Sequence, residues 1–326
     1  MVLAGDIGGT NSRLALFEAR AGGSPKAVAE RIYPSRDHDG LSAIVLLFRK
    51  EFPQPIEAAS FGVAGPVVAG WSRTTNLPWE IEAKALGAAL SLRACFLLND
   101  LEATAWGVRA LGPRDTLVLQ AGAPGAEGNS AIIAAGTGLG EAGLFRDGGG
   151  FVPFATEGGH ADFGPRDAVE DDLLLALRAR YGRVSWERVV SGPGLVAIYE
   201  FLRDRGGRRE DPEVAAAMRH GDPGAAVSSA GLVGRDPLAR EALDRFVSLY
   251  GAEAGNLALK MLARGGVFVA GGIAPHILER LASGIFMKAF LDKGRMRPVL
   301  EAMPVRVVTH DGVGLLGAAL HALEHR

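Results

Sequence analysis

The chain has 326 residues, with 35 lysines and arginines against 37 aspartates and glutamates and a formal net charge of -2. Charges so evenly balanced, without a run of five like charges, argue against a nucleic-acid-binding or membrane-binding surface. The apolar runs fall far short of the ~18–20 residues that a membrane-spanning helix needs. A single hydrophobic core stops growing at about 250–300 residues, so we expect two domains.

The single cysteine, Cys95, excludes a disulfide within the chain and is typical of a reducing compartment. Because it lies in an apolar run, we interpret it as a buried, small apolar side chain. The N-terminus leads directly into a strand, without the basic and apolar regions of a signal peptide, so we expect a cytoplasmic protein.

The first element is a predicted β-hairpin with a glycine-rich turn. Residues 1–4 and 12–17 are apolar strands, and residues 5–11, Gly-Asp-Ile-Gly-Gly-Thr-Asn, join them. Glycine lacks a Cβ, so backbone N–H groups can converge on an anion, and the threonine hydroxyl adds a donor. The pattern therefore predicts a phosphate-binding loop.

A carboxylate follows the strand predicted at residues 94–98. Asn99 and Asp100 lie between this strand and a helix predicted at residues 101–111. In open α/β sheets, ligands bind at this carboxyl end of a strand. Asp100 can cap the helix, or it can accept a proton from an attacking hydroxyl group, and both interpretations stand at this point.

A second glycine-rich turn repeats the first. Residues 130–133 lead into residues 134–140, Ala-Ala-Gly-Thr-Gly-Leu-Gly, and residues 141–145 lead out. An echo of one strand–turn–strand unit roughly 130 residues later indicates two similar lobes, whose two turns could hold one polyphosphate. We place the boundary near residues 111–113, where Leu-Gly-Pro ends a helix.

This second turn also contains G-x-G-x-x-G at residues 138–143, the pattern of dinucleotide-binding folds. That motif needs a helix N-terminus, whereas the glycines at residues 148–150 and Pro153 exclude a long helix.

The H-x-x-E-H pattern at residues 321–325 matches a zinc peptidase motif, but we interpret it as a surface helix at the end of the chain. The sequence has no P-loop motif.

Residues 157–164, Glu-Gly-Gly-His-Ala-Asp-Phe-Gly, place three side chains that can bind hydroxyl groups in one turn. Such a density of acceptors suits a polyhydroxylated substrate, and a metal site, which uses similar residue types, stays an alternative. Glu187 adds an acid before a glycine turn, or is a solvated neighbour of Arg188. An apolar strand ends in Gly271 and Gly272, which form either a tight turn or a flat shelf for an adenine ring.

Strand-like and helical patterns alternate along the whole chain, which predicts an α/β fold with helices over a mixed sheet. Strands are expected at residues 58–64, 94–98, 117–119 and 267–270, and helices at residues 101–111, 168–181 and 237–263.

Six motifs occur in order and nearly from end to end. They are residues 6–11 (Asp-Ile-Gly-Gly-Thr-Asn), 75–79 (Thr-Asn-Leu-Pro-Trp), 98–100 (Leu-Asn-Asp), 136–140 (Gly-Thr-Gly-Leu-Gly), 157–160 (Glu-Gly-Gly-His) and 271–273 (Gly-Gly-Ile). Together they strongly resemble bacterial ATP-dependent glucokinase, a family of the actin-like and hexokinase-like superfamily. The resemblance implies a two-lobed, actin-like (ribonuclease H-like) duplicated α/β fold with mixed sheets flanked by helices and a central cleft. We expect a small lobe at residues 1–111, joined by a C-terminal helix at about residues 301–326, and a large lobe at residues 112–300.

The resemblance also implies ATP-dependent phosphorylation of D-glucose to glucose 6-phosphate, with Mg²⁺ as a cofactor and in-line phosphoryl transfer. Asp100 would be the catalytic base at the sugar 6-hydroxyl, and Asp6 would act on Mg²⁺ through water. The other sugar ligands would be Asn99, Gly138, Glu157, His160 and Glu187. The phosphates would lie on Gly5, Asp6, Ile7, Gly8, Gly9, Thr10, Gly136 and Thr137, and the adenosine would lie on Gly271 and Gly272.

Two alternatives are a broader hexose or N-acetylhexosamine kinase of the same superfamily and a non-catalytic sugar sensor. Repressor, open-reading-frame and kinase proteins usually carry a cysteine-rich zinc motif beside the substrate histidine, but no cysteine follows His160. A sensor would need a DNA-binding module, for which we expect no room in this chain.

Ser12 stands where the family usually has alanine, which alters no expected contact. We expect glucose as the small-molecule partner, no nucleic-acid or membrane partner, and a homodimer.

Overall fold

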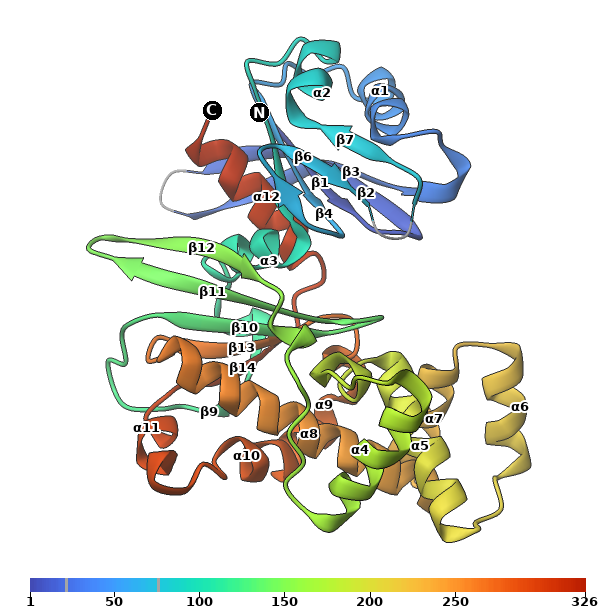
Figure 1. Cartoon of the computed structure of the whole chain (residues 1–326). Helices are drawn as coiled ribbons and strands as arrows, with labels where there is room; N and C mark the ends of the chain where they lie inside the picture. Colours follow the sequence, from blue (N-terminus) through green and yellow to red (C-terminus); the bar gives the residue numbers. More distant parts are fainter. Residues whose placement is uncertain (21–22, 75–76) are drawn as a thin grey trace. The chain divides into compact units, whose positions relative to one another are not determined.

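The computed structural model describes residues 1–20, 23–74 and 77–326 (Figure 1). The chain divides into two compact units. Each unit combines a mixed β-sheet with helices, so the predicted α/β class is confirmed. Unit 1 comprises Met1–Asp115, Pro153–Ala155 and His310–Arg326, and unit 2 comprises Thr116–Val152 and Thr156–Thr309.

Unit 1 is built on a five-stranded sheet in the order β3-β2-β1-β4-β8. β1 lies antiparallel to β2 and parallel to β4, and β4 lies parallel to β8. Leu3 of β1 packs into one core with α1, whereas Val2 and Ala4 pack into another with α12. Because both faces of the sheet are covered, β1 and β4 read as continuous apolar runs. The bounds are β1 (Val2–Ile7), β2 (Asn11–Arg20), β3 (Gly23–Pro34), β4 (Ala58–Val63), β8 (Ala94–Asn99), α1 (Leu41–Glu51) and α12 (Val313–Glu324).

α12 and α3 (Asp100–Val108) pack together in unit 1 so closely that glycine is required at the contact. A Cβ on Gly317 would overlap the carbonyl oxygen of Ala103, and a Cβ on Gly107 would overlap that of Val313. α12 also lies against β1 and β4 (Figure 1). The last helix of the chain is therefore part of the core of unit 1. The remaining elements are α2 (Ala83–Ala89) and a small sheet of β5 (Val67–Val68), β6 (Trp71–Arg73) and β7 (Glu80–Glu82).

The prediction of a surface helix at residues 321–325 is wrong for His321. This side chain is 8% exposed, and its ring lies nearly perpendicular to Phe96 and Trp106, with centroids 4.9 and 5.1 Å away. Its Nδ1 lies 3.3 Å from Ser60 Oγ. Burial lowers the pKa of His321 to about 4. The motif looked polar in isolation, but its first histidine stands on the apolar face of an amphipathic helix.

The six-stranded sheet, which belongs to unit 2 except for Pro153–Ala155 of β12, has the order β12-β11-β10-β13-β14-β9. β10 lies antiparallel to β11 and parallel to β13, just as β1 lies antiparallel to β2 and parallel to β4. The predicted duplication is therefore present as a repeated sheet topology. The bounds are β9 (Thr116–Gln120), β10 (Ser130–Ala135), β11 (Leu139–Asp147), β12 (Gly150–Thr156), β13 (Gly266–Ala270) and β14 (Val305–Val308).

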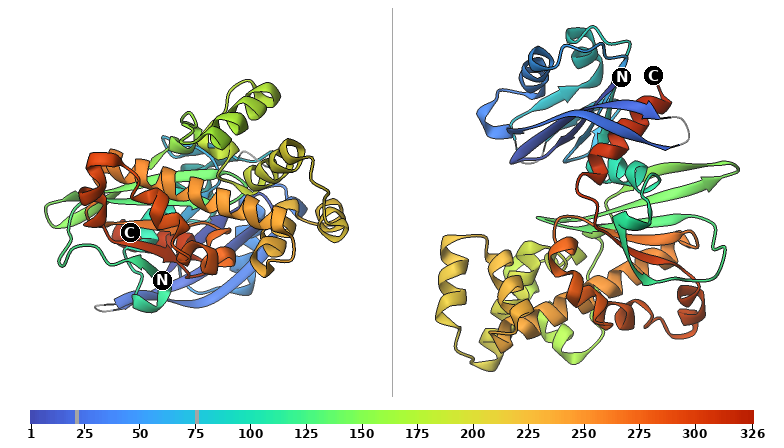
Figure 2. Two further views of the ribbon diagram at one scale, coloured as in Figure 1. Left: turned by 90° about the horizontal axis from the view of Figure 1, so that it is seen from below. Right: turned by 180° about the vertical axis from the view of Figure 1, so that it is seen from behind.

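Helices α5 to α8 pack together in unit 2 (Figure 2). Three of them begin with the same signal, an aspartate followed by proline. Asp211, Asp222 and Asp236 each cap a helix by accepting a hydrogen bond from a backbone N–H of the first turn. The helices are α4 (Ala168–Tyr181), α5 (Gly192–Gly206), α6 (Pro212–His220), α7 (Pro223–Val233), α8 (Pro237–Met261), α9 (Leu278–Ala282), α10 (Ile285–Phe290) and α11 (Arg297–Glu301).

The G-x-G-x-x-G pattern at residues 138–143 lies in a β-hairpin. β11 begins at Leu139, runs through the pattern and is followed by β12. From residue 134 to residue 156, all of which the structure describes, the chain forms strands and turns but no helix. The rejection of a dinucleotide-binding motif is therefore confirmed. Among the described residues, no helix is both long enough and apolar enough to cross a bilayer.

Candidate active site

The turn between β1 and β2 forms the first predicted phosphate loop. Gly8 N donates a hydrogen bond to Asn11 O at 2.9 Å and closes the turn. Ser35 Oγ donates to Gly8 O at 2.8 Å from outside it. Gly8 and Gly9 are half-buried and Thr10 is exposed, so the turn presents its backbone at the surface of unit 1.

Two residues predicted for this loop, Gly5 and Ile7, lie within β1 instead of in the turn. A Cβ on Gly5 would lie 2.5 Å from Phe61 Cδ1, so packing inside unit 1 already requires glycine there. Ile7 is 1% exposed and belongs to the core that includes Phe61. Their proposed contact with phosphate stays a prediction.

Asp6 lies on β1 directly opposite Arg13 of β2. Burial raises the pKa of the Asp6 carboxyl, the Arg13 guanidinium offsets part of this effect, and Asp311 adds to it. Arg13 is shared, because it also pairs with Glu30 at 2.6 Å and with Asp311 at 3.2 Å. Asp6 is therefore a partly desolvated acid held next to the first glycine turn.

The residues of unit 1 fit a magnesium ion that takes most of its ligands from water and from the phosphates of a substrate. Mg²⁺ usually keeps several waters and takes one or two carboxylates together with the phosphates of a substrate. Asp6 supplies one carboxylate beside the predicted phosphate loop. Among the described residues, no group of three His, Cys, Asp or Glu side chains is placed to hold a metal ion.

Asn99 and Asp100 lie where β8 meets α3. Asn99 is the N-cap: its Oδ1 accepts hydrogen bonds from Leu101 N at 2.9 Å and Glu102 N at 3.4 Å. Its Nδ2 donates to Gly65 O at 3.1 Å. The N-cap position is therefore held by Asn99, while Asp100 Oδ1 also accepts a hydrogen bond from Leu101 N at 2.9 Å. Asp100 is the first residue of the helix, where the backbone N–H groups favour a carboxylate.

The strand register brings the first turn and Asp100 to the same edge of the unit 1 sheet. Ile7 pairs with Val63, and Val63 pairs with Asn99, along three parallel strands. Neighbouring strands are about 4.8 Å apart, so the ends of β1 and β8 are separated by about 10 Å. This is the carboxyl edge, at which α/β sheets bind ligands.

The turn between β10 and β11 is braced by Glu187. Gly136 N donates to Gly138 O at 2.9 Å, and Leu139 N donates to Glu187 Oε2 at 3.1 Å. A Cβ on Gly138 would lie 2.5 Å from the same carboxylate oxygen, so any larger residue there displaces the Glu187 carboxylate. Thr137 is exposed at the tip. The structure therefore brings together Gly138 and Glu187, two of the predicted sugar ligands.

Gly271 and Gly272 follow β13 beside this second turn. Gly271 has a φ of 87°, and a Cβ on it would lie 2.5 Å from Ala135 O. The Tyr250 hydroxyl accepts a hydrogen bond from Ala135 N and donates one to Ala270 O, both at 3.1 Å. The ends of β10 and β13 are thus fixed together. The second predicted phosphate loop and the predicted adenosine shelf adjoin each other in unit 2.

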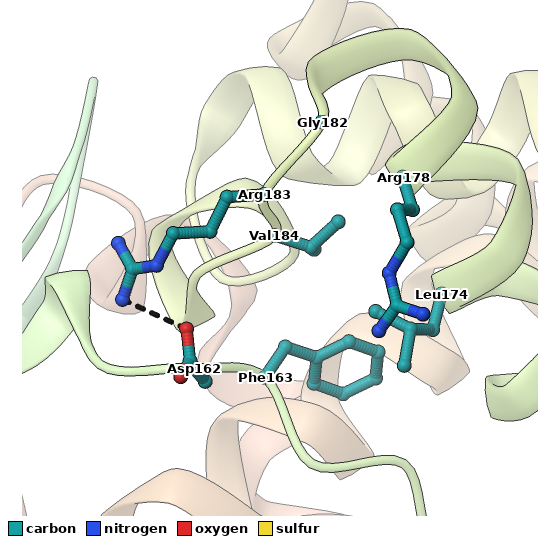
Figure 3. A pocket seen from close by; sticks show the side chains of 7 residues that line it. All are labelled: Asp162, Phe163, Leu174, Arg178, Gly182, Arg183 and Val184. Atoms are coloured by element: carbon teal, nitrogen blue, oxygen red, sulfur yellow. Dashed lines mark ion pairs between the residues drawn. The ribbon is translucent and has the colours of Figure 1, made fainter.

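Glu157 and His160 lie on an exposed turn that includes η3 (Gly158–His160). His160 Nε2 lies 3.9 Å from Glu157 Oε2. Arg183 secures this turn, because it donates to His160 O at 2.7 Å and pairs with Asp162 at 2.8 Å (Figure 3). The turn therefore has fixed anchors although its two predicted sugar ligands are exposed.

The same turn is joined to η4 (Trp186–Arg188), which carries Glu187. Trp186 N donates to Ala161 O at 3.0 Å. One short backbone segment thus holds Glu187 near both the second glycine turn and the turn at residues 157–160. The predicted sugar ligands of unit 2 come from segments that contact one another, and their roles stay predictions.

A pocket of about 310 Å³ lies next to this turn. Figure 3 shows the Arg178 side chain beside Phe163 and Leu174, apart from the Asp162–Arg183 ion pair. No predicted sugar ligand lines this pocket, so it is separate from the predicted site. Its lining residues are Asp162, Phe163, Leu174, Arg178, Gly182, Arg183 and Val184.

Two residues of the predicted motif at residues 75–79, Thr75 and Asn76, lie outside the described residues. Leu77 and Trp79 of the same motif are buried, and Thr74 Oγ1 donates to Leu77 O at 2.9 Å. The described part of this motif therefore packs into the core of unit 1.

Sequence reasoning missed two residues that support the turn at residues 157–160. Arg183 gave no signal, because arginine is common on exposed loops. Glu141 is 1% exposed, and its carboxyl group lies against Gly158. An acid inside an otherwise apolar strand was the available signal for Glu141.

Comparisons with known proteins agree along the whole chain. The family described as Glucokinase matches residues 3–325. The glucokinase of Nostoc sp. (strain PCC 7120) is 44% identical over 337 residues, which cover 99% of this chain and 98% of that protein. The glucokinase of Synechocystis sp. (strain PCC 6803) is 43% identical over 99% of this chain and 98% of its own.

A solved structure supports the same assignment. The glucokinase of an Antarctic psychrotroph has a TM-score of 0.87 and 31% identity, and the match covers 99% of this chain and 98% of that one. The ROK family glucokinase of Streptomyces griseus, with a TM-score of 0.66 and 22% identity over 99% of both chains, shares the fold. With a family match that spans nearly every residue, the chain belongs to the glucokinase family.

Proposed function

We propose that this chain transfers the γ-phosphoryl group of ATP to the 6-hydroxyl of D-glucose. The observation that carries the proposal is the Glucokinase match over residues 3–325, joined by relatives that are 44% identical along 99% of the chain. The two glycine turns support it, since a polyphosphate needs converging backbone donors.

Asp100 is the proposed catalytic base. It lies at the carboxyl edge of the unit 1 sheet, and Asn99 supplies the cap of α3. A carboxylate in this place can orient the sugar hydroxyl and accept its proton as the bond to phosphorus forms. Phosphoryl transfer needs little covalent chemistry from the protein, so most of the rate enhancement comes from positioning and charge stabilisation.

The backbone of residues 8–10 and 136–138 is proposed to hold the phosphates, and Gly271 and Gly272 the adenosine. Asp6 is proposed to orient the waters of Mg²⁺, which when bound neutralises charge on the phosphates. Because Asp6 is desolvated, its pKa is raised, so it loses its charge earlier than an exposed aspartate as the pH falls.

Asn99, Glu157, His160 and Glu187 are proposed to bind the other sugar hydroxyls, with Gly138 beside them. Glu187 already accepts a hydrogen bond from Leu139 N, which fixes the direction of its second oxygen. Carboxylates and an imidazole in fixed directions can discriminate between hexoses that differ in one hydroxyl, because an unmatched buried polar group is costly.

An ATP-coupled assay across a panel of hexoses tests this proposal. Glucose should be the best substrate, with mannose, fructose and N-acetylglucosamine well behind it. Similar kcat/KM values for several hexoses would indicate the broader kinase instead. Sugar binding without turnover would indicate the sensor.

We also propose a cytoplasmic location and a homodimer. The lone Cys95, whose pKa burial raises to about 12, is consistent with a reducing compartment and is an unreactive thiol. Light scattering of the purified protein tests the dimer, and cell fractionation tests the location.

A further inference from the structure

Strand β11 of unit 2 buries an acid that the proposed mechanism does not use. Glu141 is 1% exposed, and Glu253 of α8 is fully buried. No donor among the described residues gives a hydrogen bond to the Oε1 atom of Glu141. A buried carboxylate with an unsatisfied oxygen is strongly disfavoured, so the geometry favours the neutral, protonated form of Glu141.

Of the two buried acids, Glu253 carries the negative charge, because the cations and the hydrogen-bond donors lie next to it. Lys260 Nζ lies 3.3 Å from Glu253 Oε1, and Asn256 Nδ2 donates to Glu253 Oε2 at 2.8 Å. Lys293 Nζ donates to Asn256 Oδ1 at 2.6 Å. Glu141 instead faces the negative charge of Glu253.

These surroundings set the titration of Glu141. Burial first, and then the charge of Glu253, raise the pKa of Glu141 to about 8, and Lys260 opposes this. The third titratable group of α8 near it is Tyr250, whose own pKa is raised by burial. Glu141 therefore loses its proton in the mildly alkaline range.

Glu141 also forms the floor of a predicted sugar-binding turn. A Cβ on Gly158 would overlap Glu141 Oε2, so the backbone of the turn rests on this carboxyl. Thr156 Oγ1 donates to Glu141 O at 3.0 Å and accepts a hydrogen bond from Gly158 N at 3.2 Å. Glu157 and His160 stand at the two ends of the segment supported in this way.

We propose that the neutral carboxyl of Glu141 is a positioning group for sugar recognition. Packed between Glu253 and Gly158, it holds the turn that carries Glu157 and His160. The inference rests on the proposed function, because it assumes that these two side chains bind the sugar. Ionisation of Glu141 places a second negative charge beside Glu253 and disturbs the backbone above it. Glucose affinity then falls, whereas the phosphoryl transfer step is little affected.

The test is the KM for glucose between about pH 7 and about pH 9.5, measured at saturating ATP in the wild type and in Glu141→Gln. If binding requires a neutral group with a pKa of about 8, the wild-type KM rises about tenfold at pH 9 while kcat changes little. Glu141→Gln has the same shape and cannot ionise, so it lacks this alkaline rise. Glu141→Ala removes the floor and raises KM already at neutral pH.

Glu170→Gln is the matched control. Glu170 is another fully buried acid of unit 2, but Arg166 at 2.6 Å and Arg245 at 3.4 Å satisfy its charge. This variant should lose thermal stability and keep the alkaline rise in KM. Glucose titration without ATP, followed by the fluorescence of Trp186 next to Glu187, should show the same pH dependence as KM.

A wild type that does not phosphorylate glucose contradicts the proposed function. An active wild type whose alkaline rise persists unchanged in Glu141→Gln overturns the positioning role alone. If Glu141→Gln does not fold, Glu253→Gln replaces it. Removal of the facing negative charge lowers the pKa of Glu141, so the rise in KM must move to lower pH, and an unmoved rise overturns the inference.

Discussion

The two units share a sheet topology and differ in the charge beside their glycine turns. β1 and β10 each pair antiparallel with the next strand and parallel with a later one, and a turn follows each of them. One residue before the end of its strand, β1 has Asp6 and β10 has Ala134. Unit 2 instead places Glu187 against its turn through Leu139 N. The backbone of the two predicted phosphate turns is thus repeated, whereas the carboxylates beside them come from different segments.

The largest effect should come from the acid of unit 1 at the end of β8. Asp100→Asn should lower kcat by at least ~10²–10⁴, the usual scale for a general base, because the amide cannot accept the hydroxyl proton. Glucose binding should survive, as measured by tryptophan fluorescence. The control is Glu102→Gln, which changes another acid two residues after Asp100 on the same helix. Near-normal turnover by Asp100→Asn would contradict the assignment of the base.

The next effect tests Asp6, the carboxylate that the first turn receives from its own strand and that Ala134 replaces in unit 2. Asp6→Asn should lower kcat/KM for ATP about 10–100-fold, as loss of an outer-sphere metal partner commonly does. A magnesium titration should show a higher requirement in the variant. Asp39→Asn, an exposed acid of the same unit, serves as the control. An unchanged magnesium requirement would contradict a role of Asp6 in magnesium binding.

Local patterns made the backbone of both turns predictable, because glycine spacing and flanking apolar strands act within a few residues. The interpretation of Asp100 stayed open because capping depends on the geometry of one residue, and the structure gives the cap to Asn99. Burial of His321 and Glu141 was missed because it is created by segments far away in the sequence. The roles of the site residues come from family resemblance and remain predictions.

The second turn can be tested through its glycine. Gly138→Ala places a Cβ 2.5 Å from Glu187 Oε2, so the carboxylate must move and lose its bond from Leu139 N. Such overpacking should raise KM for glucose about tenfold. Gly164→Ala is the matched control, since a Cβ there meets no atom within 4 Å. If both variants bind glucose equally well, Glu187 is not a sugar ligand braced by this turn.

The smallest effect concerns α8 and α12, each of which covers one sheet. One of these helices buries an acid and the other buries a base. α8 of unit 2 buries Glu253, and burial raises its pKa, whereas burial lowers the pKa of His321 on α12 of unit 1 to about 4. Unit 1 should therefore be the acid-sensitive half. The unfolded chain binds the histidine proton below about pH 6.5 and the folded chain only below about pH 4, so stability rises with pH between these values.

From pH 7 to pH 5.5 this difference should cost about 1 kcal/mol of unfolding free energy. His321→Leu cannot take up a proton when the chain unfolds, so it should show a correspondingly weaker loss of stability in thermal or urea unfolding over this range. His220→Gln, at the exposed end of α6, should behave like the wild type. Trp106, which packs against His321, reports on unit 1 in these experiments. If His321→Leu keeps the full wild-type acid dependence, the buried histidine does not distinguish the two units, and other groups set the acid limit of the fold.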